Sequence, residues 1–127
     1  MHDINIGSDF DLLCDEGVPV REMLQRFGEK EFLYVKYLSL FAKDATFAKL
    51  EQALEAGDVE AALVAAHSCK GLCANLGIYP LAELCGRARD LLRGEELEEA
   101  RALLPALQSR YAAIVAAIER VVEARNI

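Results

Sequence analysis

Apolar residues recur every three or four positions over most of this 127-residue chain, a spacing that predicts helices rather than strands. The first such stretch is short. It begins near Val20, just after Pro19, and ends at Gly28. Residues 1–17 carry no sustained periodicity and include two glycines, so we expect a flexible lead-in there. Residues 18–127 are then expected to form the folded domain.

A second apolar stretch extends from Glu29 to Ala56 and predicts one long helix that ends at Gly57. A break at Asp44, near its middle, is the alternative. The apolar positions of this stretch include Leu33, Tyr37, Leu40, Phe47, Leu50 and Leu54.

The third stretch should begin at Asp58, which is a good N-cap, and run to about Asn75. Gly77 can adopt the left-handed conformation that ends a helix, and Pro80 suits the first turn of the next one. Because the fourth stretch continues to Gly94, residues 62–93 are predicted to form a helical hairpin.

The last stretch, from Leu97 to Val121, has apolar residues in alternating steps of three and four, a seam that requires partner helices. Pro105 removes a backbone donor and should kink this helix. Four long helices with short connections predict an all-α, up-and-down four-helix bundle, with the short N-terminal helix covering one end.

His67 is the candidate reactive residue, because it projects from the third helix on the side opposite the apolar face. Lys70 and Gly71 lie one turn further along the same side. A glycine inside a helix costs about 0.5–1 kcal/mol relative to alanine, so Gly71 suggests that something approaches the chain closely there. The alternative is that His67 is an ordinary surface or core residue, as a lone histidine on a helix usually is.

Three of the four cysteines, Cys69, Cys73 and Cys85, fall on apolar helix faces, where burial as small apolar residues explains them. Cys14 lies in the expected lead-in. The cysteine spacing matches no zinc pattern, and we expect no metal site.

The net charge of −7 argues against nonspecific binding to nucleic acid or to an anionic membrane, because basic patches drive both. The chain has no apolar run of about 18 residues and no secretory pattern at its start. We therefore expect a cytoplasmic, monomeric protein whose partner is another protein.

Residues 66–71 (AHSCKG), followed by 75–77 (NLG) and by Leu81, Leu84 and Cys85, resemble the histidine-containing phosphotransfer (Hpt) domains of bacterial two-component phosphorelays. The resemblance extends over roughly residues 18–122. It implies a four-helix bundle in which His67 accepts a phosphoryl group from a receiver-domain aspartate and donates it to another receiver. By the same resemblance Lys70 contacts the phosphoryl oxygens, Gly71 leaves room for them, and the receiver domain supplies Mg²⁺.

Phosphoryl transfer has a loose transition state, so one imidazole and one or two cations can suffice for it. If the hairpin turns near residue 78, Arg89 should lie level with His67, and Arg93 one turn further on. A solvated face is the alternative for both arginines. Leu63, Val64 and Ala74 surround His67 and predict an apolar docking patch for the partner.

Two rival functions remain at this point. One is a helical adaptor that binds a partner without chemistry, which should tolerate glutamine at position 67. The other is a ligand-binding or metal-binding bundle, which would need inward-facing carboxylates and histidines. We expect no kinase activity, because the chain has no glycine-rich nucleotide-binding motif.

Overall fold

The computed structural model describes residues 8–125, and this part of the chain is helical, without a strand. In chain order the elements are the 3₁₀ helix η2 (Ser8–Phe10) and the α-helices α1 (Asp11–Asp15), α2 (Val20–Arg26), α3 (Glu31–Lys43), α4 (Thr46–Ala56), α5 (Val59–Asn75), α6 (Tyr79–Arg93), α7 (Leu97–Arg101) and α8 (Leu104–Ala124).

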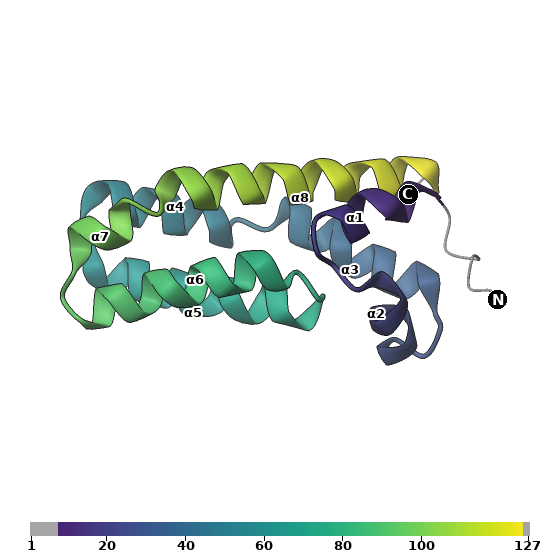
Figure 1. The fold of residues 1–127 in the computed structure, drawn as a ribbon, viewed down its shortest axis with the longest axis horizontal. Coiled ribbons are helices and arrows are strands. Elements are labelled where there is room, and N and C mark those ends of the chain that lie inside the picture. Colours follow the sequence, from purple (N-terminus) through teal and green to yellow (C-terminus); the bar gives the residue numbers. More distant parts are fainter. Residues whose placement is uncertain (1–7, 126–127) are drawn as a thin grey trace.

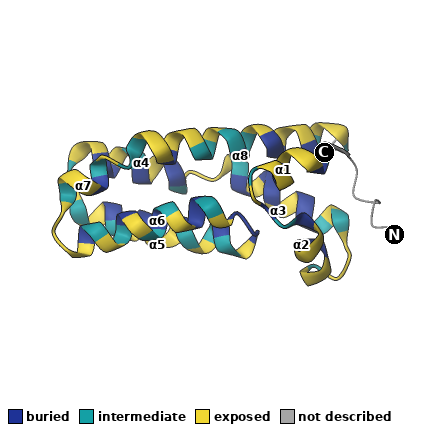
Figure 2. Cartoon of the chain, viewed as in Figure 1, coloured by how far each residue is buried: buried dark blue, intermediate teal, exposed yellow. Residues whose placement is uncertain are grey.

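The long helices form a four-helix bundle, as the sequence predicts (Figure 1). Helices α5 and α6 make an antiparallel hairpin. Helix α8 crosses the whole length of the molecule, and α3 and α4 together supply the remaining arm. Each long helix turns its buried residues toward the others and its exposed residues outward (Figure 2). No helix in the described range is both long enough and apolar enough to span a membrane.

The α3–α4 arm is broken at Asp44, so the prediction of one continuous helix from Glu29 to Ala56 is wrong and its alternative is confirmed. The backbone of Asp44 is extended (ψ 141°), and its Oδ1 accepts a hydrogen bond from the Thr46 N–H at 2.7 Å. Hydrogen bonds from the side chain and backbone of Thr46 lower the pKa of Asp44. An aspartate that caps the next helix in this way competes with continuation of the previous one.

The last helix is also divided, and the predicted kink at Pro105 is wrong. Helix α7 ends at Arg101, and α8 begins at Leu104, which places Pro105 in the first turn of a new helix. The missing N–H of a proline costs nothing in a first turn, because N–H groups there have no partner within the helix.

The α5–α6 hairpin has the predicted boundaries. Asp58 Oδ1 accepts from the Ala61 N–H at 3.2 Å at its start, and Gly77 is left-handed (φ +80°) at its turn. Helix α2 covers this turn, as expected. A Cβ at Gly77 would lie 2.7 Å from Met23 Cγ, so only glycine fits there.

A buried tyrosine hydroxyl links the α5–α6 turn to helix α3. Tyr34, which is fully buried on α3, donates its hydroxyl hydrogen to the Leu76 carbonyl at 2.9 Å. Burial raises the pKa of Tyr34.

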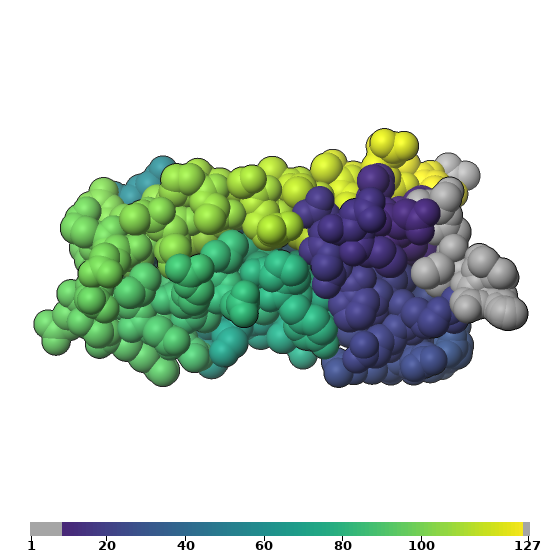
Figure 3. Space-filling model, viewed as in Figure 1, coloured from purple at the N-terminus to yellow at the C-terminus, as the bar shows by residue number. Residues whose placement is uncertain are grey.

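The expectation of a lead-in without regular structure is wrong for residues 8–15, which form η2 and α1. Phe10 and Leu13 are fully buried. The Arg125 guanidinium lies 4.4 Å above the Phe10 ring and also pairs with Asp9 and Glu31. Figure 3 shows this N-terminal segment in purple, packed against the end of the yellow α8. The part of the expected lead-in formed by residues 1–7 lies outside the described range.

Candidate functional site

His67 is exposed at the middle of α5, on the side away from the core. The opposite side of α5 is buried at Ala62, Ala66, Cys69 and Cys73. This arrangement follows from the helical spacing of the apolar residues, and it confirms that the imidazole projects outward.

Arg89 of α6 lies beside the imidazole, with its Nη1 3.4 Å from His67 Nδ1. The two residues are level because α5 and α6 are antiparallel around a turn near residue 78, as the sequence predicts. The Arg89 side chain is only 18% exposed, and its Nη2 lies 3.7 Å from Asp90 Oδ1. A permanently charged group is therefore held next to one ring nitrogen.

Lys70 extends from α5 across α6 at Gly86. A Cβ built on Gly86 would lie 3.5 Å from Lys70 Cε and 3.8 Å from its Nζ. The Lys70 stem thus passes over Gly86, where a side chain larger than alanine would meet it, and Lys70 is partly buried. Gly86 is not among the residues predicted from the sequence, although a glycine in a helix interior, one turn before Arg89, is a signal for close approach.

Gly71 has open space beside it. A Cβ there would meet no atom of the described chain within 4 Å outside its own helix backbone. Gly71 is exposed and lies one turn from His67, so the surface next to the ring is unobstructed.

The remaining predicted residues differ in accessibility. Arg93 is exposed, one turn beyond Arg89. Val64 is 68% exposed, but Leu63 and Ala74 are partly buried, and Leu63 packs against the core. Of the three apolar residues expected to form an exposed patch, Val64 alone is exposed, and Leu63 and Ala74 are partly buried.

Helix α3 carries exposed apolar side chains, and two of them belong to the apolar positions from which this helix was predicted. Leu40 is 51% exposed, Tyr37 is 44% exposed and Phe32 is 68% exposed. Helical spacing identified Tyr37 and Leu40 as apolar positions but could not show that α3 turns them outward, because that depends on how the arm is rotated.

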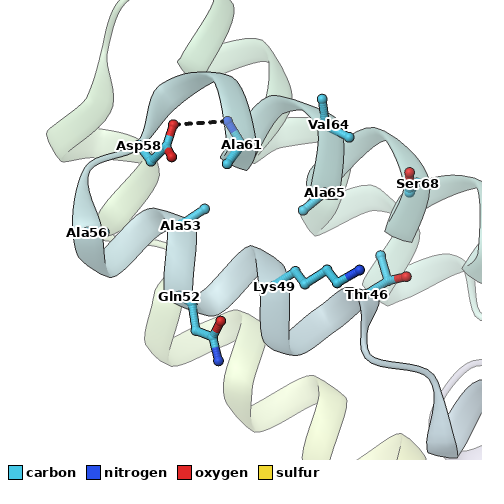
Figure 4. A pocket seen from close by; sticks show the side chains of 10 residues that line it. All are labelled: Thr46, Lys49, Gln52, Ala53, Ala56, Asp58, Ala61, Val64, Ala65 and Ser68. Carbon is cyan, nitrogen blue, oxygen red and sulfur yellow. Dashed lines mark hydrogen bonds between the residues drawn. The ribbon is translucent and has the colours of Figure 1, made fainter.

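A groove of about 610 Å³ runs along the junction of α4 and α5, on one side of the helix that carries His67. Its floor contains Ala53 and Ala65, while Lys49, Val64 and Ser68 stand along its edges (Figure 4). Ser68 follows His67 directly, so the groove adjoins the histidine face.

Cys69, Cys73 and Cys85 are buried together between α5 and α6, as predicted. Hydrogen bonding to Cys69 and burial raise the pKa of both Cys73 and Cys85. Within residues 8–125 no group of three or more histidine, cysteine or acidic side chains is arranged to hold a metal ion. All three thiols are buried in the hydrophobic core, where they pack as small residues.

In a comparison with protein families, the family model described as the Hpt domain matches residues 38–121, well over half of the chain. This range covers the C-terminal part of α3, all of α4 to α7 and most of α8, and it includes His67, Lys70, Gly71 and Arg89. Neither the curated proteins nor the solved structures gave a significant match.

Proposed function

The chain belongs to the Hpt domain family, and from this premise we propose that His67 accepts a phosphoryl group from the aspartyl phosphate of a receiver domain and donates it to another receiver. Hpt domains act in histidine phosphotransfer within phosphorelays and interact with receiver domains. One observation supports the assignment to His67 above all. The imidazole is exposed, and Nη1 of the mostly buried Arg89 side chain lies 3.4 Å from its Nδ1.

The proposed reaction exchanges one phosphorus bond for another. A lone pair of the imidazole attacks phosphorus, the acyl O–P bond breaks, and the aspartate leaves as a carboxylate. Because Arg89 occupies the Nδ1 side of the ring, Nε2 is the nitrogen open to the phosphoryl group. The ring then loses the proton on Nδ1 to solvent, which leaves an uncharged imidazole ring that carries the anionic phosphoryl group on Nε2.

Cations near the ring would compensate the charge on the transferred group. We assign this role to Lys70 and Arg89, with Arg93 as a further cation at the edge of the site. Gly71 leaves space for the phosphoryl oxygens, in agreement with the open volume beside it. Few protein groups are needed, because positioning and charge compensation dominate catalysis of phosphoryl transfer.

The receiver domain would dock over Val64, with Leu63 and Ala74 at the margin of the contact. Leu40 and Tyr37 of α3 are further exposed apolar side chains that a partner could contact. The Mg²⁺ ion of the reaction belongs to the acidic pocket of the receiver in this proposal, and the Hpt chain contributes no metal ligand.

The proposal is tested by incubating the purified protein with phosphorylated receiver domains and measuring intact mass. We expect the addition of one acid-labile phosphate, and its absence in His67→Gln. His2→Gln is the matched control and should be phosphorylated like the wild type.

The rival adaptor function makes the opposite prediction. An adaptor would bind receivers equally well with His67→Gln and would acquire no phosphate in either form. Phosphate that persists in His67→Gln would refute the assignment of His67.

A further inference from the structure

The contact between Arg89 and His67 constrains where the imidazole carries its proton. A guanidinium has five N–H donors and no acceptor. Its Nη1 lies 3.4 Å from His67 Nδ1, so Nδ1 must be the accepting, unprotonated nitrogen of the neutral ring. The single ring proton is then on Nε2.

This tautomer is the wrong one for attack through Nε2. A protonated ring nitrogen has no free lone pair in the ring plane, and the nitrogen that does have one, Nδ1, is covered by Arg89. We infer that Arg89 is a tautomer latch, a positioning residue that holds unphosphorylated His67 in its unreactive Nε2–H form until Arg89 withdraws. The inference rests on the proposed function of His67.

The surroundings of Arg89 explain how such a latch could open. Its Nε is inaccessible to solvent and has no hydrogen-bond partner among the described residues, and its Nη2 is 3.7 Å from Asp90, beyond good hydrogen-bond distance. The guanidinium is therefore poorly satisfied where it lies. A phosphoryl group offers charged acceptors that match the planar donor set, so it would draw Arg89 away from the ring.

Once Arg89 leaves, the ring can exchange its Nε2 proton for one on Nδ1 through water, which frees the Nε2 lone pair for attack. After the N–P bond has formed, Nδ1 loses its proton to solvent, and Arg89 can return to the Nδ1 lone pair. A phosphoimidazole held unprotonated in this way is a poorer leaving group, so Arg89 should also prolong the phosphorylated state.

Nitrogen-15 NMR of the unphosphorylated protein tests the latch directly, because protonated and unprotonated ring nitrogens have well-separated chemical shifts. At about pH 8.5, above the range in which imidazoles ordinarily titrate, we expect the Nε2–H form of His67 to predominate by about five-fold, a ratio within the range that one net hydrogen bond supports. His67→Gln identifies the signals and separates them from those of His2.

Arg89→Gln offers Nδ1 a carbonyl oxygen that can accept, and the Nδ1–H fraction should rise several-fold. Arg89→Glu, which can only accept, should make Nδ1–H the major form. Arg93→Gln and Arg93→Glu make the same charge changes one turn away and should leave the tautomer as in the wild type. Circular dichroism checks that each variant is folded.

A wild-type ring that carries its proton on Nδ1, or a tautomer ratio that both Arg89 variants leave unchanged, would overturn the latch. Neither result touches the phosphotransfer proposal, because the spectra are recorded without a receiver domain. Conversely, absence of phosphate transfer to a chain with the expected tautomer would refute the function and leave the latch geometry standing.

Discussion

Gly86 has no side chain, and this lets the Lys70 stem cross α6 at that position. Because glycine is a poor helix former, Gly86→Leu should stabilise α6 by up to about 1 kcal/mol. The leucine side chain would nevertheless compete with the Lys70 stem for the space beside residue 86. We expect single-turnover phosphotransfer to slow by about ten-fold, less than the hundred-fold or greater loss typical when a stabilising donor is removed entirely.

Gly86→Ala is the matched control. Its Cβ would lie at an ordinary contact distance of 3.5 Å from Lys70, so the transfer rate should stay near the wild-type value. If Gly86→Leu transferred phosphate at the wild-type rate, the course of Lys70 across α6 would have no role in the reaction.

At the residue scale, helical geometry was enough to predict the exposed His67 and the level of Arg89. It could not predict the 3.4 Å contact between them, which depends on the rotamers of two side chains on different helices. The contact of Lys70 with Gly86 could not be predicted for a similar reason, because it depends on how α5 and α6 pack.

Among the helices, the hydrogen bond from Tyr34 to Leu76 joins α3 to the hairpin turn. Tyr34→Phe would remove it and leave the Leu76 carbonyl without this donor, so we expect the free energy of unfolding to fall by about 1–2 kcal/mol. Urea unfolding at neutral pH measures this change. Tyr37→Phe, at an exposed position on the same helix, is the control.

Tyr34→Phe should also change how the free energy of unfolding depends on pH in alkaline solution. Burial raises the pKa of Tyr34 in the folded protein, whereas in the unfolded chain a tyrosine ionises near its usual pKa of about 10. The unfolded chain therefore binds fewer protons above about pH 10, and wild-type stability should fall as pH rises through that range. Tyr34→Phe should show a shallower decline, and an identical decline in both proteins would contradict the burial argument.

At the scale of elements, sequence patterns predicted the helices but not both of their interruptions. Asp44 was recognised as a possible break, yet continuous apolar spacing favoured one long helix. The extended backbone and the bond to Thr46 decide the matter. Pro105 was assigned to a kink because the seam from Leu97 to Val121 keeps its period across the connection at residues 102–103, which conceals the gap.

For the whole molecule, Arg125 is the residue that joins the two ends of the fold. Its guanidinium contacts Asp9, Glu31 and the Phe10 ring. Arg125→Ala would remove these partly buried interactions and should cost about 1–3 kcal/mol. The urea midpoint should fall, and native-state hydrogen exchange should speed up first in α1.

The exposed Arg120 lies on the same helix and provides the control substitution Arg120→Ala, which should change the midpoint little. Equal effects of the two substitutions would show that the N-terminal segment is held by Phe10 and Leu13 alone. Burial of this segment could not be predicted from local pattern, because its contacts with Arg125 and α8 span almost the entire chain.

The contact between Asp9 and Arg125 also makes the described chain nearly a closed ring. Its first and last helices meet at one end of the bundle (Figure 1). A short linker could therefore join these ends, and new termini could be opened at the exposed connection between α6 and α7, around Glu95. In such a circular permutant the chain would begin and end at the opposite end of the molecule, while α5, α6 and the face that carries His67 would remain intact.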